Sequence, residues 1–139
     1  MMLADSTAWI WSRRKAYPEL RQWFDEQLEM GEIATCDQVR LELLAGVHSS
    51  EHESRRRDLD ALDTCVITPR EWRRALDVQA DLARLGTDNH KGVRPADLLI
   101  AAAAEAAGVE LVHYDNHFER IQEITQQPMK WLAPKGTLR

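Results

Sequence analysis

Cysteine is scarce in this sequence: Cys36 and Cys65 are the only two, and each lies in a short apolar segment. A disulfide framework needs more cysteines, and a zinc-binding knuckle needs closer spacing. We therefore expect two buried thiols, and we exclude a disulfide-stabilised scaffold and a cysteine-ligated metal site.

Long apolar runs are also missing. The longest candidate, residues 98–112, is interrupted by two glutamates and a glycine, so no run reaches the ~18 residues of a membrane span. Near the N-terminus the positive charges follow the first apolar stretch, whereas a signal peptide places them before it. We therefore expect a cytoplasmic protein that does not associate with membranes.

Positive charge is in deficit, with 18 Lys and Arg against 23 Asp and Glu and a formal net charge of -5. At first sight this balance argues against a nucleic-acid partner. Hydrophobic residues make up 44% of the chain, which excludes wholesale disorder. A length of 139 residues, without repeats or a linker, predicts a single domain over residues 1–139.

Short apolar segments alternate with longer amphipathic ones. The short segments predict strands at residues 2–4, 33–36, 65–67, 109–114 and 129–132. The longer ones predict helices at about residues 8–11, 18–30, 38–46, 49–62, 69–85, 95–107 and 116–124, with Asp37 as the cap of the third. Strands separated by helices predict an α/β fold with a central parallel sheet of about five short strands.

Two aspartates follow predicted strands directly. Asp5 comes after the first strand, and Asp115 comes after the strand that precedes residue 115. Ligands of open α/β sheets bind beyond the carboxyl ends of the strands, so both side chains belong to the edge where chemistry is expected. Either residue alone is also a good helix N-cap.

Two further carboxylates lie on helices where a surface charge is not expected. Glu42 belongs to a helix that is apolar nearly all round, which predicts a buried helix and either a salt bridge to an arginine or a functional role. Asp97 lies in the first turn of an alanine-rich helix, where it is either an N-terminal stabiliser or part of a close-packed site.

Taken together, the four carboxylates point to a metal site. Clustered carboxylates raise one another's pKa unless a cation neutralises them. Oxygen ligands without an accompanying set of cysteines or histidines favour Mg²⁺ or Mn²⁺ over Zn²⁺. Such a centre lowers the pKa of bound water and offsets charge on a phosphoryl group, which is typical of phosphodiester hydrolysis.

Four segments occur in the order and spacing of a known family: DSTAWI at 5–10, VRLELLAG at 39–46, RPADLLIAA at 94–102 and VHYDNHFERI at 112–121. In these motifs the chain resembles the PIN-domain ribonucleases, specifically VapC toxins of prokaryotic toxin-antitoxin pairs. The resemblance covers nearly the whole chain. It implies a PIN-like three-layer α/β/α fold and an endoribonuclease that depends on Mg²⁺ or Mn²⁺.

The resemblance also implies roles for individual residues. Asp5 and Asp97 correspond to the principal metal ligands, and Asp115 to a further ligand or a residue that holds water. Glu42 corresponds to the residue that orients the attacking water or a second metal, and Thr7 to a hydroxyl residue that supports the site. The family further implies a homodimer and a VapB-like antitoxin whose C-terminal segment fills the active-site groove.

The last motif departs from the common family pattern Thr-x-Asp-x-Asp-Phe. His113 replaces the threonine and His117 replaces the second aspartate, so one usual acidic position is lost. His117 is either a ligand of Mn²⁺ or phosphate, or a polar residue at a helix start. We place it with Asn116 in the surroundings of the site.

RNA binding needs basic and aromatic side chains near the same edge. Arg40 lies beside Glu42, and Lys91 and Arg94 lie in a loop over residues 86–94 that leads into Asp97, so these three are the predicted RNA contacts. Trp9 and Trp11 favour core packing or a dimer contact over base stacking.

Other function classes remain as alternatives. A Mg²⁺-binding phosphoacceptor domain needs an Asp at the end of its third strand, where this chain has Thr68-Pro69. A catalytically inactive PIN-like interaction module would not need all four carboxylates, and a structure-specific DNA nuclease would share the chemistry. Leaving out the four carboxylates changes the formal net charge from -5 to -1, so the acidity is largely that of the predicted site.

Overall fold

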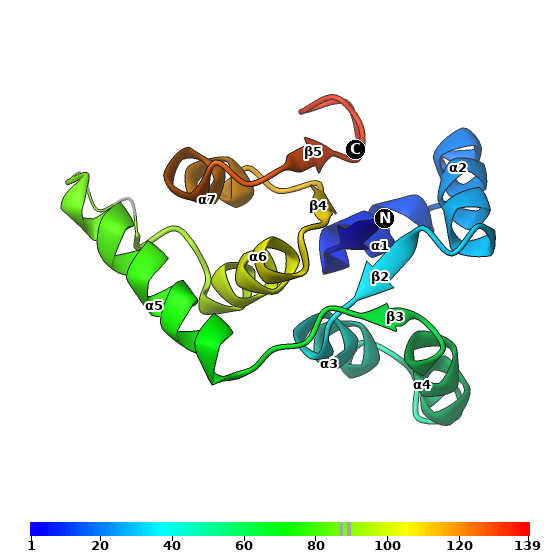
Figure 1. Ribbon diagram of the computed structural model, residues 1–139. Coiled ribbons are helices and arrows are strands. Elements are labelled where there is room, and N and C mark those ends of the chain that lie inside the picture. The colour runs from blue at the N-terminus through cyan, green and yellow to red at the C-terminus, as the bar shows by residue number, and fades with distance from the viewer. Residues whose placement is uncertain (87, 89) are drawn as a thin grey trace.

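A computed structural model describes residues 1–86, 88 and 90–139 and contains one parallel sheet (Figure 1). Its strands are β1 (Met2–Ala4), β2 (Ile33–Thr35), β3 (Asp63–Thr64), β4 (Glu110–His113) and β5 (Met129–Trp131). They lie in the order β3-β2-β1-β4-β5, and each neighbouring pair is parallel. The predicted parallel sheet of five short strands is confirmed.

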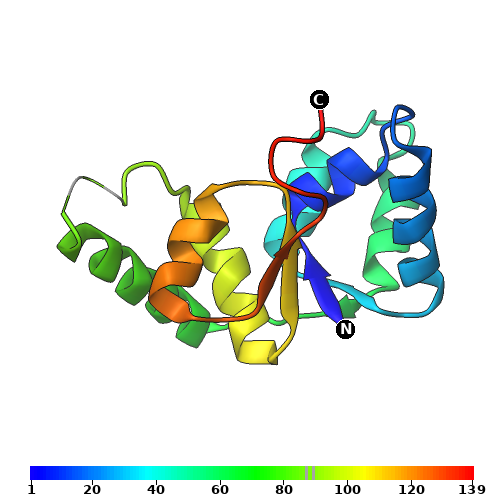
Figure 2. The ribbon, with the colours of Figure 1, turned by 90° about the horizontal axis from the view of Figure 1, so that it is seen from above.

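Seven helices complete the part of the chain that the structure describes. They are α1 (Ser6–Ser12), α2 (Pro18–Glu29), α3 (Asp37–Ala45), α4 (His52–Asp60), α5 (Pro69–Arg84), α6 (Pro95–Ala107) and α7 (His117–Thr125). Helices α5, α6 and α7 lie on one side of the sheet and α1 and α2 on the other (Figures 1 and 2). This arrangement confirms the three-layer α/β/α architecture.

Both faces of the sheet are buried because neighbouring residues of a strand point to opposite faces. Leu3 and Leu111 belong to the apolar cluster that includes α5, α6 and α7. Ala4 and Val112, the next residue of each strand, belong to the second cluster, which includes Phe24 of α2. The two layers of helices therefore each cover one side of β1 and β4.

The strand order reverses between β1 and β4, and we call the space at the carboxyl ends of these two strands the β1/β4 crevice. From β1 the chain adds β2 and β3 on one side, and it then returns through α5 and α6 to add β4 on the other side of β1. In such sheets, ligands bind at the carboxyl ends of the two strands where the order reverses. Asp5 follows β1 and Asp115 follows β4, so both residues lie at this point.

Several helix ends follow local sequence signals. Proline is the first residue of α2, α5 and α6, where its missing N–H costs no hydrogen bond. The start of α5 carries a capping box, in which Thr68 and Glu71 satisfy each other's backbone N–H groups. Helix α6 ends at Gly108, whose φ of 69° lies in the left-handed region that glycine adopts without strain.

Three expectations for the segment between residues 36 and 67 were wrong. The third strand covers Asp63–Thr64 and not residues 65–67, because pairing at this sheet edge ends after the bond from Cys65 N–H to the Thr35 carbonyl (2.7 Å). Helix α3 is capped by Cys36 and not by Asp37. It is also not buried all round, since only Val39 and Arg40 are buried and Leu41 is 68% exposed.

The remaining sequence expectations on burial are confirmed. Cys36 and Cys65 are free and buried. Trp9 packs edge-to-face on Phe24, with ring centroids 4.9 Å apart, and Trp11 packs on Tyr114.

Among the helices of the described residues, none combines the length and the apolar character that crossing a membrane requires. Residues 87 and 89 of the predicted loop 86–94 lie outside the described residues.

Arg40, a predicted RNA contact, has a structural position instead. Its buried guanidinium donates to the Leu59 carbonyl (3.1 Å) and the Thr64 hydroxyl (2.8 Å). It also pairs with Asp37 and Asp60. The group therefore connects α3 to the end of α4 and to β3.

Replacing Arg40 by Met should lower the free energy of unfolding by about 1–3 kcal/mol. The loss comes mainly from the two hydrogen bonds to Leu59 and Thr64, because Asp37 and Asp60 are exposed and their ion pairs are screened by water. Urea unfolding measures the change. Arg56→Met is the matched control, because Arg56 is exposed and pairs with the same Asp60. Its replacement should change the free energy of unfolding by less than about 0.5 kcal/mol. Equal stability of the Arg40 variant and the wild type would contradict the structural role.

Candidate metal centre

Asp5 is a completely buried carboxylate at the end of β1. Its Oδ1 accepts hydrogen bonds from the Thr7 hydroxyl (2.7 Å) and the Ala8 N–H (3.1 Å), and so caps α1. Its Oδ2 is buried and has no hydrogen-bond partner. Burial raises the pKa of Asp5 from 3.8 to about 7, against the lowering effect of its hydrogen bonds, and the charge of Asp97 adds to the rise.

Thr7 holds Asp5 in place. Its hydroxyl donates to Asp5 and accepts a hydrogen bond from the backbone N–H of Tyr114 (2.8 Å). Tyr114 directly follows β4, so this one hydroxyl connects the start of α1 to the end of β4. The structure therefore places Thr7 between Asp5 and the end of β4.

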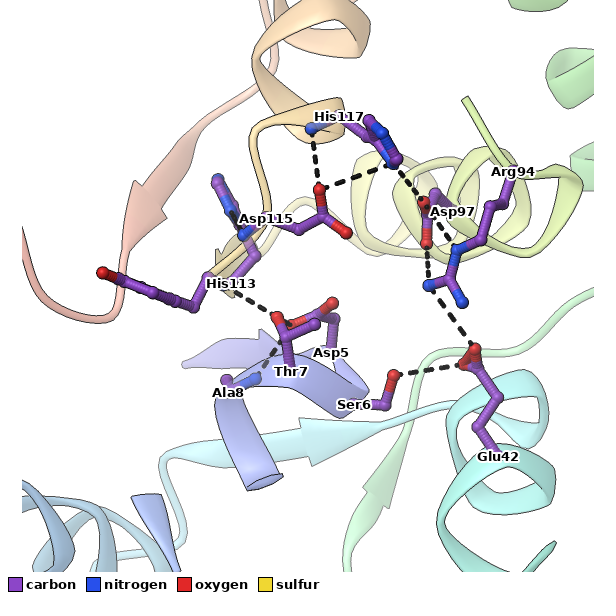
Figure 3. A network of polar contacts seen from close by, with 11 residues as sticks. Asp5, Ser6, Thr7, Ala8, Glu42, Arg94, Asp97, His113, Asp115 and His117 are labelled. Atoms are coloured by element: carbon purple, nitrogen blue, oxygen red, sulfur yellow. Dashed lines mark hydrogen bonds and ion pairs between the residues drawn. The ribbon is translucent and has the colours of Figure 1, made fainter. Parts of the chain in front are cut away.

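Asp97, Asp115 and His117 form a compact group (Figure 3). Each offers one ligand atom, and these atoms lie within 4.8 Å of one another. Asp97 is completely buried in the first turn of α6, Asp115 follows β4, and His117 begins α7. The His117 N–H donates to Asp115 Oδ1 (2.9 Å), which fixes the carboxylate against the helix start.

Glu42 and Arg94 close the opposite side of the group. Arg94 donates two hydrogen bonds to Asp97, at 2.8 and 3.3 Å, and its guanidinium lies 3.8 Å from Glu42. The hydrogen bond to Asp97 raises the pKa of Arg94. Glu42 also accepts a hydrogen bond from the Ser6 hydroxyl (3.4 Å), and burial raises its pKa. Its predicted arginine partner is thus Arg94.

His113 contacts the backbone of Asp115 through its ring. Its ring lies between Phe118 and Trp131, with centroids 4.9 Å from each, and burial lowers its pKa to about 4. A neutral imidazole can accept a hydrogen bond, and Nδ1 of His113 accepts the N–H of Asp115 (3.2 Å). In this chain, His113 therefore positions the backbone of Asp115.

The structure brings together most, but not all, of the predicted site residues. Seven of them lie at the β1/β4 crevice (Figure 3): Asp5, Thr7, Glu42, Arg94, Asp97, Asp115 and His117. Arg40 does not, for the reason given above. Lys91 is exposed and pairs with Asp88 (3.3 Å), and the Asn116 side chain makes no capping bond at the start of α7. Ser6 was missed, because nothing in the sequence shows that α3 lies across from it.

The residues at the crevice fit a divalent cation. Buried Asp97, partly exposed Asp115 and the imidazole of His117 offer oxygen and nitrogen ligands at one point, and buried Asp5 lies beside them at the end of β1 (Figure 3). The buried Oδ2 of Asp5 lacks a partner, although a carboxylate oxygen is costly to bury without one. A bound cation would satisfy this atom and reduce the repulsion among the carboxylates.

Without metal, Asp5→Asn should stabilise the protein, and the gain should grow as pH rises from about 4 to about 8. Between pH 3.8 and about 7 the folded state binds more protons at Asp5 than the unfolded state does, so wild-type stability falls as pH rises through this window. The Asn oxygen still accepts from Thr7 and Ala8, and the uncharged amide should gain about 1–3 kcal/mol at the upper end. Urea unfolding in EDTA at both pH values tests this, and a pH-independent difference would contradict it.

Comparisons with known proteins agree with this geometry. Residues 2–124 match the PIN domain family. The chain is 37% identical over 135 residues to Ribonuclease VapC18 of Mycobacterium tuberculosis, covering 96% of both proteins. It is 34% identical over 140 residues to Ribonuclease VapC21 of the same species, covering 95% of this chain and 99% of the relative.

Solved structures show the same fold. A DNA-bound VapBC from Salmonella typhimurium superposes with a TM-score of 0.70 at 20% identity, over 95% of this chain and 98% of that one. VapBC2 from Rickettsia felis, bound to a promoter DNA fragment, gives a TM-score of 0.67 at 20% identity, over 94% and 97%. The family match, the two relatives and the shared fold lead to one conclusion: this chain is a VapC-like member of the PIN-domain family.

Proposed function

We propose that this protein is a divalent-metal-dependent endoribonuclease and the toxin of a VapBC-type toxin-antitoxin pair. The observation that carries the proposal is the group of Asp97, Asp115 and His117 at the β1/β4 crevice, beside which Asp5 has one buried oxygen without a partner (Figure 3). The relatives named Ribonuclease VapC support RNA as the substrate.

Asp5, Asp97 and Asp115 would hold the cation, Mg²⁺ or Mn²⁺. When bound, the cation supplies two effects: it lowers the pKa of a water molecule and offsets negative charge on the phosphoryl oxygens. The supporting groups keep the carboxylates at fixed positions. Thr7 holds Asp5, and the backbone N–H of His117 holds Asp115. Such preorganisation lowers the reorganisation that the reaction requires.

Glu42 is the group best placed to orient the attacking water and to take its proton. It lies across the crevice from Asp115, comes from a different element, and is held by Ser6 (Figure 3). Burial raises its pKa, which makes it a stronger base than an exposed glutamate. In the hydrolysis, the water oxygen bonds to phosphorus, the bond from phosphorus to one ribose oxygen breaks, and that oxygen leaves with a proton.

We propose that Arg94 binds the RNA phosphate. In the structure its guanidinium balances Asp97 and Glu42, and the side chain is half exposed. With a cation at Asp97, the guanidinium of Arg94 would no longer be needed to balance this carboxylate and would be free to bind a phosphate oxygen. Lys91 is exposed in the loop that leads to Arg94. It would add a second positive charge along the path of the RNA.

The other function classes fit the geometry less well. A phosphoacceptor domain needs its acidic residue beside the crevice, but β3 is an edge strand separated from β1 by β2. An inactive interaction module would not require three carboxylates from separate elements to meet with an unpartnered buried oxygen. These observations favour the enzyme.

The partners follow from the family. The two structural neighbours described above are VapBC assemblies. We propose a VapB-like antitoxin as the inhibitor of this protein, a homodimer as its own assembly, and residues 1–139 as a single PIN domain. The RNA substrate would be met in the cytoplasm.

Asp97→Asn should reduce RNA cleavage at least about 100-fold, because it removes a ligand charge while keeping the shape of the side chain. The readout is the map of new RNA 5′ ends after brief induction, together with cleavage of the same RNA by the purified protein. Asp77→Asn, at an exposed aspartate of α5, is the matched control and should cleave like the wild type.

Two further arms of this experiment test the metal and the antitoxin. Excess EDTA should stop cleavage, and co-expression with the product of a short reading frame upstream of the gene should suppress it. Full activity of Asp97→Asn would overturn the site, and full activity in EDTA would overturn the metal dependence.

A further inference from the structure

His117 faces the carboxylates with a nitrogen that has no hydrogen-bond partner. Its Nδ1 lies 3.4 Å from Asp115 Oδ1 and 3.7 Å from Asp97 Oδ2. The atom is buried, yet neither contact has the geometry of a hydrogen bond. The nitrogen faces the space that Asp97 and Asp115 share (Figure 3).

The position of His117 is fixed by the chain. It is the first residue of α7, and its backbone N–H is bonded to Asp115 (2.9 Å). The contributing side chains therefore come from three different elements: α6, the end of β4, and α7. Adjacent ligands of a six-coordinate ion with bonds of about 2.1 Å lie about 3 Å apart. The observed separations are within reach of that value through small side-chain rotations.

A second, independent observation marks this point as a ligand site. Asp5 is completely buried, and its Oδ2 has no hydrogen-bond partner. The charge of Asp97 adds to the rise in the pKa of Asp5. Two polar atoms from opposite sides of the crevice, one from Asp5 and one from His117, thus both lack a partner. A cation at this point would satisfy the nitrogen and offset the charge at the free oxygen of Asp5.

We infer that His117 is a direct ligand of the metal and that its nitrogen makes the centre select Mn²⁺ over Mg²⁺. This inference rests on the metal site of the proposed function and specifies its chemistry. Mg²⁺ is a hard cation that is bound almost entirely by oxygen and keeps several of its waters. First-row transition metals gain more from an imidazole nitrogen, and Mn²⁺ is the member of that series closest to Mg²⁺ in its use of carboxylate ligands.

The test uses the full chain without RNA and measures metal binding directly. Calorimetric titration with MnCl₂ and with MgCl₂ gives both dissociation constants for the wild type, His117→Ala and His117→Asp. His52→Ala is the matched control, because His52 is exposed on α4. Pulsed electron paramagnetic resonance of the Mn²⁺-loaded proteins detects a nitrogen nucleus bound to the ion.

The wild type and the His52 control should bind Mn²⁺ at least about tenfold more tightly than Mg²⁺ and show coupling to an imidazole nitrogen. His117→Ala should lose that coupling and at least about tenfold in Mn²⁺ affinity, while its Mg²⁺ affinity changes less. His117→Asp should reduce the difference between the dissociation constants for Mg²⁺ and Mn²⁺. Absence of nitrogen coupling in the wild type, or equal losses for both metals in His117→Ala, would overturn the inference.

The result is separable from that of the proposed function. Nitrogen coupling with no RNA cleavage would support the inference and overturn the function. RNA cleavage with Mn²⁺ bound by oxygen alone would support the function and overturn the inference.

Discussion

The burial of negative charge at one end of the sheet is the constraint on which the rest of this site depends. The fold places Asp5, Asp97 and Asp115 around the crevice between β1 and β4, and it brings Glu42 to the same region. Two of these carboxylates are completely buried, where charge is most costly. Burial is the main cause of the raised pKa of Asp5 and of Glu42, and the charge of Asp97 adds to both. A site of this kind is unfavourable until a cation occupies it.

The groups around the carboxylates show how the fold accommodates this cost. Arg94 offsets the charge of Asp97 and Glu42 from the solvent side. Thr7, Ser6 and the backbone of α1 and α7 supply hydrogen bonds that fix the oxygens without adding charge. Neutral His113 performs the same role for the backbone of Asp115. The carboxylates are consequently rigid, and they keep their ability to attract a metal.

Much of this arrangement was predictable from the sequence. Aspartates directly after short apolar segments must lie at the carboxyl edge of a parallel sheet, which located Asp5 and Asp115. Proline and glycine at helix ends located α5 and α6, and with them Asp97. The third strand was less predictable, since an edge strand of two residues has little burial to distinguish it from residues 65–67. Arg40 was harder still, because the sequence does not reveal that its side chain reaches the end of α4. Arg94 was easier to place, because it directly precedes the helix of Asp97.

We propose above all that the crevice between β1 and β4 binds a divalent cation through side chains of separate elements. Crystals of the full chain soaked in MnCl₂ test it most directly, because anomalous scattering locates Mn²⁺ without reference to activity. We expect a peak among Asp97, Asp115 and His117, on the side that the free oxygen of Asp5 faces. Crystals that hold no Mn²⁺ at that point, with Arg94 still paired to Asp97, would contradict it.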